Sequence, residues 1–434
     1  MTIKNDSVII IGAGVAGLAL ANILKYQGVP YKVFERDPTS DDRTQGWSIS
    51  IHFCLLALKS SMDPIKYATL GEKSAVDPEN PRTSTFSMLN GNTGESFFTF
   101  GDSHDDGVDI YRVNRKRFRT WLMEGIDVTW NKRLDHYTVV ERGSGVEATF
   151  TDGTVVHGSI IVGADGINSE VCRQLIGTEE FAKTTISNPL KILAGSYWID
   201  TEFRRHIEET LSKSHMMAIA SSQEDGAHPT GLFSSLIDVD KSKEKPYRMM
   251  WSISTSDEKG PYCETDQKRL EQAKGWITKA NFSGLLHRLV METPEDTKVV
   301  PLNLRERSPH SKLDALQRNH PVVLIGDALH SMTMYRGEGA NHAIEDSCLL
   351  GMKLADVYKG EKSMEEALDT YYKDALPRGR KAVAESHEAA NMIHDSLDKV
   401  IEMINIASIS AEERMKIINR ENKLNISLEN SNKA

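Results

Sequence analysis

The stretch "SVIIIGAGVAG", residues 7–17, decides the fold because it leads from a buried strand into a helix through a glycine turn. Residues 7–11 are mostly β-branched and do not alternate with polar residues, which is typical of a parallel strand buried on both faces. Gly12, Gly14 and Gly17 follow in G-x-G-x-x-G spacing. In a dinucleotide-binding turn, the first glycine permits the tight turn, the second admits a pyrophosphate and the third lets helix and strand pack closely.

The residues after this turn complete a strand–helix–strand unit. The pattern predicts a helix over residues 14–27, with Gly28 at its end, and a second strand in "YKVFERD", residues 31–37. Glu35 lies about 20 residues past the glycines, where a carboxylate accepts hydrogen bonds from ribose hydroxyls. Because an acid disfavours a 2′-phosphate, the unit predicts a site for FAD or NAD rather than NADP.

Two later strand ends repeat the arrangement. "VGADG", residues 162–166, and "LIGDALH", residues 324–330, are apolar runs that end at a glycine near an aspartate. Such an aspartate is often only a helix cap or a turn residue. Because loops at the carboxyl ends of parallel strands converge on one crevice, the three ends together predict that Asp165, Gly326 and Asp327 line the same dinucleotide site.

Composition restricts the function classes. The chain has 434 residues and a net charge of -10, which argues against a nucleic-acid or anionic-membrane surface. Its four cysteines form no CxxC or Cys/His spacing, so we expect free thiols, a reducing compartment and no metal site. The apolar run 8–24 is short and interrupted by glycines. We therefore expect a cytoplasmic protein with no integral membrane segment and with small-molecule partners.

Three motifs in this order carry a family resemblance. "GAGVAG" with Glu35 and Arg36, "GADGINS" (163–169) and "GDALHSMTMYRGEGANHAIED" (326–346) resemble the fingerprints of the class A flavoprotein monooxygenases, the para-hydroxybenzoate hydroxylase-like group. The resemblance spans residues 7 to about 360. The stretch "QGWSISIH" (45–52) particularly resembles fungal members that act on specialised metabolites.

The resemblance implies an α/β fold with a Rossmann-like FAD-binding domain, an inserted β-sheet substrate domain and a helical C-terminal region. Strand-like stretches between about 180 and 305, separated by charged or Gly/Pro-containing loops, independently favour a second sheet. After Tyr111, a basic amphipathic pattern predicts a helix. We expect these divisions: FAD-binding domain, 1–180 and 306–360; substrate domain, 181–305; C-terminal helices and a frayed tail, 361–434.

The resemblance also assigns cofactor-binding residues. Arg36 would lie near the adenine, Arg115 would reach the flavin or pyrophosphate, and Asp327 would bind the ribityl chain. Trp47 and Ser48 would lie nearest the ring. The full set comprises Gly12, Gly14, Gly17, Glu35, Arg36, Trp47, Ser48, Arg115, Asp165, Gly326, Asp327, Gly337, Gly339, Ala340 and Asn341. The last four precede a helix, or lie in its first turn, where the positive end of the helix dipole would favour the anionic reduced flavin.

The implied reaction is a monooxygenation. NADPH or NADH would reduce FAD, O₂ would form a flavin C4a-hydroperoxide, and one oxygen would hydroxylate or epoxidise an aromatic or polycyclic small molecule. His52 and Tyr335 are candidate catalytic bases, although an isolated His or Tyr at such a place is more often a packing or hydrogen-bonding residue. For His330, a structural hydrogen bond explains its position at least as well as catalysis does.

Two residues depart from the family pattern, and several alternatives stay open. Cys172 stands where the family usually has an arginine, which puts the handling of NAD(P)H in doubt, and Met334 replaces a frequent proline. A flavin-dependent reductase or oxidase, or a non-enzymatic binding protein on the same fold, would share the dinucleotide motifs. A halogenase would be expected to carry GWxWxIP, which the sequence lacks. The chain could be a monomer or a homodimer.

Overall fold

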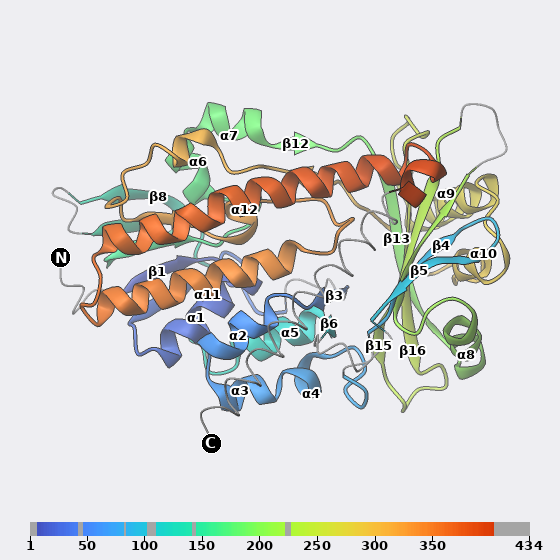
Figure 1. Ribbon diagram of the computed structural model, residues 1–434, viewed down its shortest axis with the longest axis horizontal. Coiled ribbons are helices and arrows are strands. Elements are labelled where there is room, and N and C mark those ends of the chain that lie inside the picture. The colour runs from blue at the N-terminus through green and yellow to red at the C-terminus, as the bar shows by residue number, and fades with distance from the viewer. Residues whose placement is uncertain are drawn as a thin grey trace, which may run out of the picture.

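The computed structural model describes residues 7–41, 47–81, 84–101, 110–140, 145–221 and 227–402. Figure 1 shows two parts along the longest axis, a parallel sheet with its helices and a second, larger sheet. A long helix, α12 (Met364–Ile393), runs along both. The α/β fold is confirmed. Residues 403–434, which include the predicted frayed tail, lie outside the described residues.

The first part is built on five strands that are all parallel. In order along the sheet, these strands are β19 (Val322–Leu324), β11 (Ile160–Gly163), β1 (Val8–Ile11), β2 (Tyr31–Phe34) and β7 (Val128–Thr129). The helix α1 (Val15–Tyr26) joins β1 to β2, as the glycine pattern predicts. Because the strands are parallel, all their carboxyl ends lie along one edge of the sheet.

Different layers cover the two faces of this sheet. Ile9 and Ile10 are neighbours on β1 and therefore point to opposite faces. Ile10 faces α1 at Gly17, whereas Ile9 lies under Gly158 of a three-stranded antiparallel sheet. That sheet comprises β8 (Leu134–Val139), β9 (Val146–Phe150) and β10 (Val155–Gly158). On the other face, α1 packs closely on α11 (Gly339–Tyr358), where a Cβ at Gly351 would lie 2.7 Å from Ile23.

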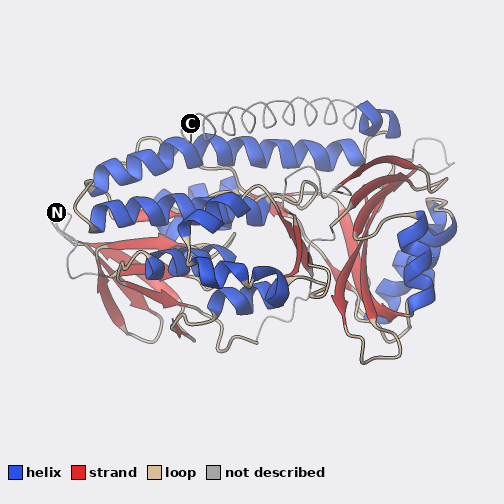
Figure 2. Ribbon diagram, turned by 60° about the horizontal axis from the view of Figure 1, so that its bottom comes forward, coloured by secondary structure: helices blue, strands red, loops and turns tan. Residues whose placement is uncertain are grey.

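The second part is a seven-stranded sheet, antiparallel except for the β14–β4 pair. Its strands, in spatial order, are β17 (Val300–Pro301), β13 (Lys191–Ile199), β16 (Tyr247–Thr255), β15 (Thr230–Val239), β14 (His215–Ala220), β4 (Phe86–Asn90) and β5 (Ser96–Phe100). The last two lie within residues 1–180, so this sheet draws strands from both sides of the boundary placed at residue 180. Three helices cover its outer face: α8 (Thr201–Thr210), α9 (Asp266–Lys279) and α10 (Gly284–Met291) (Figures 1 and 2).

A two-stranded sheet, β3 (Ser48–Ile51) with β6 (Tyr111–Asn114), lies between the two parts. The helix predicted after Tyr111 begins only at α5 (Arg115–Met123). The reason is Asn114, whose side chain caps α5 by accepting hydrogen bonds from Lys116 N and Arg117 N. Its amide also donates to Ile237 O of β15 at 2.9 Å, which ties β6 to the second sheet.

The remaining elements are short and connect the larger ones. They are α2 (Leu55–Ser61), α3 (Pro64–Ala68), α4 (Leu70–Ser74), α6 (Glu170–Ile176), α7 (Thr178–Thr184), β12 (Ile186–Ser187), β18 (Arg305–Glu306) and the 3₁₀ turns η3 (Ser311–Leu313) and η4 (Gly326–Ala328).

The helix α12 contacts both parts of the molecule. Near its start, Tyr371 donates a hydrogen bond to Leu324 O of β19 at 2.8 Å. Just past its end, His394 Nε2 lies 2.8 Å from Ser254 Oγ of β16. A single helix therefore spans from the parallel sheet to the second sheet.

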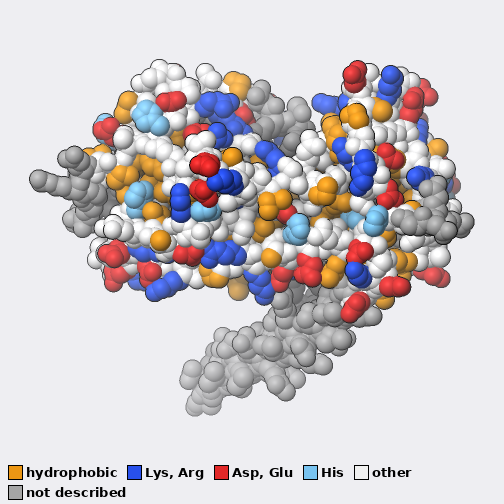
Figure 3. Space-filling model, turned by 90° about the horizontal axis from the view of Figure 1, so that it is seen from above, with side chains coloured by type: hydrophobic (Ala, Val, Ile, Leu, Met, Phe, Trp, Pro, Cys, Tyr) orange, Lys and Arg blue, Asp and Glu red, His pale blue; other side chains and the backbone are white. Residues whose placement is uncertain are grey.

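The surface carries charges of both signs. In Figure 3, Lys and Arg side chains are interspersed with Asp and Glu over the visible face, and hydrophobic side chains form small groups. No helix among the described residues is both long and apolar enough to span a bilayer.

Candidate active site

The glycine turn after β1 has the geometry that its sequence predicts. Gly12 has φ +110°, and a Cβ there would lie 2.4 Å from Ala164 O. A Cβ at Gly17 would lie 2.0 Å from Gly12 O, so only glycine lets α1 approach the strand this closely. A Cβ at Gly14, in contrast, would meet no protein atom within 4 Å. The outer two glycines hold the turn together, and the middle one faces open space.

The helix that follows can bind an anion. Gly14 is the N-cap of α1, no side chain caps this end, and the first turn contains no acid. The first N–H groups of a helix have no partner within the helix, and the dipole makes this end positive. These features fit a pyrophosphate. The start of α11 is similar, since the N-cap Glu338 makes no side-chain cap and Gly337 before it has φ +65°.

Glu35 lies at the carboxyl end of β2, beside the glycine turn. Its carboxylate accepts hydrogen bonds from Ala13 N at 2.8 Å and Asp37 N at 3.1 Å, and the residue is only 3% exposed. Arg36 next to it is half-buried. Glu35 thus braces the turn, and its predicted contact with the ribose stays a prediction.

Asp165 and Asp327 lie at the ends of β11 and β19. Asp165 accepts a hydrogen bond from Glu170 N at 2.7 Å through Oδ2, while its buried Oδ1 has no hydrogen-bond partner among the described residues. Desolvation raises the pKa of both carboxyls, and the charges of His330, Arg115 and Arg307 oppose it at Asp327. Asp327 is nevertheless exposed. Protein atoms therefore surround it, but solvent can still reach it.

Together, these groups form the donor set of a dinucleotide site. Backbone N–H groups at the start of α1 suit a pyrophosphate, and carboxylate oxygens at three strand ends suit hydroxyl groups. All lie at one edge of the parallel sheet, as predicted. The residues therefore fit FAD, which would occupy the edge from the start of α1 to the start of α11.

Arg115, Trp47 and Ser48 lie where β3 and β6 meet the second sheet. Arg115 N donates to Trp47 O at 2.9 Å, and the Arg115 charge opposes the rise that burial causes in the pKa of Asp327, so these residues lie near one another. Ser48 Oγ contacts Ser235 Oγ at 3.0 Å and Leu236 O at 3.1 Å. The Ser48 hydroxyl is therefore turned toward β15.

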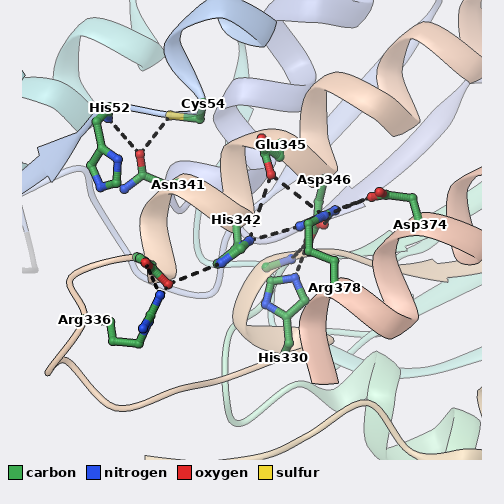
Figure 4. Close-up of polar contacts among 12 residues, drawn as sticks. His52, Cys54, His330, Arg336, Asn341, His342, Glu345, Asp346, Asp374 and Arg378 are labelled. Atoms are coloured by element: carbon green, nitrogen blue, oxygen red, sulfur yellow. Dashed lines mark hydrogen bonds and ion pairs between the residues drawn. The ribbon is translucent and has the colours of Figure 1, made fainter. Parts of the chain in front are cut away.

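Asn341 joins the start of α11 to β3, as Figure 4 shows in part. It is fully buried; its Oδ1 accepts from His52 N at 2.9 Å and from the Cys54 thiol at 3.3 Å. Its Nδ2 donates to Ser50 O at 2.9 Å. The side chain thus positions β3, while Gly339 and Ala340 leave the first turn partly exposed. Their contacts with the isoalloxazine stay predictions.

The two candidate bases differ in their surroundings. Burial lowers the pKa of His52, and the charge of Glu338 only partly opposes this, so the imidazole is neutral near pH 7. Tyr335 instead packs among apolar residues of the second sheet, with its ring 5.4 Å from that of His394. Burial raises the pKa of its hydroxyl. His52 is therefore the better-placed proton acceptor of the two.

A buried ionic network under the Gly326 turn was not predicted (Figure 4). Asp346 and His330 are both fully buried, with Oδ2 and Nε2 2.7 Å apart. Asp346 also accepts from Gly326 N and from Arg378 of α12, each at 2.8 Å. Although burial opposes it, the charge of Asp346 raises the pKa of His330. The network fixes the turn that carries Asp327, so His330 has a structural role.

Arg307 is a further residue of this region that the sequence analysis did not predict. It is 1% exposed and donates to Ile167 O at 2.8 Å and to Asp327 O at 3.4 Å, which joins two of the strand-end turns. Burial raises the pKa of Cys172 to about 11, and the Arg307 charge opposes the shift. A guanidinium thus lies near Cys172, where the family usually has an arginine, but it belongs to Arg307 of another segment. Its surroundings, "RERSP", carry no motif that could have revealed it.

Comparisons with known proteins identify the family of this chain. The family described as FAD binding domain matches residues 5–386. The FAD-dependent monooxygenase phnB of Penicillium herquei is 32% identical over 398 residues, covering 91% of this chain and 93% of the relative. The FAD-dependent monooxygenase dbaB of Emericella nidulans is 33% identical over 365 residues, covering 80% and 86%.

Solved structures share the fold. HpxO of Klebsiella pneumoniae, in complex with FAD and uric acid, has a TM-score of 0.70 at 17% identity, covering 95% of this chain and 96% of that chain. PqsL of Pseudomonas aeruginosa, in complex with 2-aminobenzoylacetate, has a TM-score of 0.70 at 17% identity, covering 92% and 99%. The family match and the two relatives above 30% identity show that this chain belongs to the flavoprotein monooxygenases and is an FAD-dependent monooxygenase.

Proposed function

We propose that the enzyme uses NADH or NADPH and O₂ to hydroxylate or epoxidise an aromatic or polycyclic small molecule. The observation that carries this proposal is the position of β3. One end of this strand is tied to the start of α11 through Asn341, and Ser48 contacts the second sheet. A substrate on that sheet would therefore lie beside the flavin-facing edge of the first part.

Each part of the cofactor has its own protein groups in this proposal. The N–H groups at the start of α1 hold the pyrophosphate, and Glu35 and Asp327 accept hydrogen bonds from hydroxyls of the ribose and the ribityl chain. The first turn of α11 faces the flavin. When bound, FAD supplies the two-electron reduction and the oxygen activation that side chains cannot. His52 accepts a proton from the substrate, and the packed sheet and helices exclude water.

The second sheet is the proposed substrate wall. Phe86, Phe233, Met88 and Met217 form part of a cluster on this sheet, toward the end of α12. Apolar walls with a few polar groups are typical of small-molecule pockets. Two proteins of the same fold bind uric acid and 2-aminobenzoylacetate. These observations support a compact, flat substrate.

The direct test is anaerobic reduction followed by exposure to oxygen. The purified protein, loaded with FAD, is mixed with NADH or NADPH without O₂, and flavin absorbance is followed in stopped flow. The proposal expects reduction by at least one of the two and, after O₂ is admitted with substrate, a product heavier by one oxygen atom from ¹⁸O₂. Reduction without oxygen incorporation across a panel of aromatic compounds would instead favour a reductase or oxidase.

Asp327→Asn should weaken FAD binding. The change removes a charged acceptor from the ribityl site, and hydrogen bonds to charged groups contribute about 1.5–3 kcal/mol, so the Kd should rise roughly 10- to 100-fold. The measurement is flavin fluorescence on titrating apoprotein with FAD. Asp296→Asn, at an exposed position in the loop after α10, is the matched control and should keep the wild-type Kd. Equal Kd values for all three proteins would contradict the ribityl assignment.

A further inference from the structure

Arg112 of β6 is a buried arginine with an unusual set of partners. It is 5% exposed, and its guanidinium donates to Ser50 Oγ at 2.9 Å and to Ser235 Oγ at 2.9 and 3.2 Å. Among the described residues, no carboxylate forms an ion pair with it. Among these residues, the hydrogen-bond acceptors of the buried guanidinium are two neutral hydroxyl groups.

In the described part of the chain, the other two arginines buried to a similar degree differ in this respect. Arg204, 3% exposed, pairs with Glu208 at 2.7 Å. Burial lowers the pKa of Arg307, and the charges of the nearby Asp165 and Asp327 oppose this shift. A buried charge without a counter-charge is costly, so it is usually paired or used for binding. Burial lowers the pKa of Arg112 to about 9, which still leaves the guanidinium charged at pH 7.

Basic and aromatic side chains surround the guanidinium of Arg112. His215 Nε2 lies 3.4 Å from Ser50 Oγ, and its ring lies 5.2 Å from that of Phe86 and 6.3 Å from that of Phe233. The Arg112 guanidinium is 5.7 Å from the Phe233 ring. Burial and the charge of Arg112 hold the pKa of His215 well below its usual range, so the ring is neutral. His215, Phe86 and Phe233 are all partly exposed, so solvent reaches this group.

Through Ser50, this group contacts β3, the strand that joins the cofactor edge to the second sheet. Ser50 is two residues before His52, the proposed proton acceptor, and its carbonyl accepts from Asn341 at the start of α11. An anion held by Arg112 would therefore lie between the flavin-facing helix and the aromatic side chains of the sheet.

We propose that Arg112, together with His215, binds an ionised oxygen of the substrate, a carboxylate or an acidic phenolate, while the aromatic part of the substrate packs against Phe86 and Phe233. This inference rests on the proposed function, because it names the substrate class of the same site. The guanidinium supplies the charge and its donors. The His215 nitrogens Nε2 and Nδ1 lie 3.4 Å from Ser50 Oγ and 3.2 Å from Ser214 Oγ, so the neutral ring would share its one N–H between a serine hydroxyl and the substrate. The substrate would in this way complete the ion pair that the protein leaves unmade.

A purely structural role for Arg112 predicts a different result. In that case the guanidinium only ties β6 to β15 through Ser235, and its removal would weaken every ligand of the site alike. A charge receptor instead separates ligands that differ only in ionisation. The test therefore compares matched pairs of an acid and its neutral counterpart.

The experiment uses the FAD-loaded protein and follows ligand binding through the visible absorption of the flavin. The carboxylate pairs are benzoate with benzamide, 2-naphthoate with 2-naphthamide, and anthracene-2-carboxylate with its amide. The phenolate pair is 4-nitrophenolate with 4-nitroanisole at pH 8. We expect at least one acid to bind roughly 10- to 100-fold more tightly than its neutral counterpart. The pair that shows the preference identifies which kind of oxygen the site binds.

The variants assign the preference to Arg112. Arg112→Met should abolish it and leave the Kd of the neutral member within about threefold, whereas Arg112→Lys should keep part of it because the charge remains. Arg205→Met, at an exposed position on α8, is the matched control and should keep the full preference. Ser235→Ala removes the tie to β15 but not the charge, so it should also keep the preference.

Three results would overturn the proposal. The first is that no acid binds to the wild type more tightly than its neutral partner, which includes the case in which neither member of a pair binds. Alternatively, Arg112→Met weakens both members equally, or Ser235→Ala abolishes the preference as fully as Arg112→Met does. If Arg112→Met fails to fold, the wild-type pairs, Arg112→Lys and Ser235→Ala still decide. A protein that takes up no FAD would contradict the cofactor site itself, while a flavoprotein without acid preference contradicts only the anion site.

Discussion

Replacing Asp346 with alanine is expected to destabilise the fold by about 3–5 kcal/mol, because it leaves buried positive charge without its partner. Asp346 is fully buried and is the common acceptor for His330, Arg378 and Gly326 N. Its charge also keeps the pKa of His330 raised against the effect of burial. Without that charge, His330 should lose its proton, and the turn that carries Asp327 should lose its anchor.

The measurement is urea unfolding of the apoprotein at pH 7, and the matched control is Asp374→Ala. Asp374 contacts the same arginine at 2.8 Å, but its side chain is 51% exposed, and exposed pairs contribute at most about 1 kcal/mol. The two variants thus remove an acid from the same guanidinium at different depths. Similar losses of stability in both would mean that burial of Asp346 is not what makes the network strong.

Gly17→Ala is expected to prevent folding around the dinucleotide site. Its Cβ would lie 2.0 Å from Gly12 O, a backbone atom of the turn between β1 and α1. Ordinary overpacking costs about 1–3 kcal/mol, and a backbone clash of this size should exceed that range. The expected result is a colourless protein with a lowered midpoint of thermal unfolding.

Gly14→Ala provides the matched comparison in the same turn. Its Cβ would contact no protein atom within 4 Å, and its φ of -81° suits alanine. This variant should therefore keep the stability of the wild type or gain about 0.4–1 kcal/mol. Its FAD affinity should fall, because the new methyl group points toward the proposed pyrophosphate site. If Gly14→Ala bound FAD as the wild type does, the pyrophosphate would have to lie elsewhere.

These two positions show why the glycine turn after β1 could be predicted from the sequence. The roles of Gly14 and Gly17 follow from local geometry on β1 and α1, whereas Gly12 also lies against Ala164, which follows β11. The placement of Asp165 and Asp327 follows from one further rule, the convergence of parallel strand ends. These motifs predicted the family, the fold class and the enzyme class, and the family match and the relatives confirm them.

Side chains that work through distant partners could not be predicted in the same way. Ser48 hydrogen-bonds to Ser235, and Asn341 to Ser50, so each contact crosses a large part of the chain without a periodic signal. Strand β4 pairs in parallel with β14, and its short sequence does not indicate which sheet it joins. Arg112 looked like part of a basic helix, whereas it lies on a strand because Asn114 starts the helix later.

The length of helix α12 fixes the distance between the cofactor site and the proposed substrate wall. Gly379 on this helix packs against His330 beneath the cofactor edge, and His394 just past its end contacts Ser254 of the second sheet. One residue inserted between these points would shift the far end by about 1.5 Å and rotate it by about 100°. Small insertions or deletions there would reshape the substrate wall while leaving the cofactor turns intact. Evolution could in this way retune substrate choice through helix length alone.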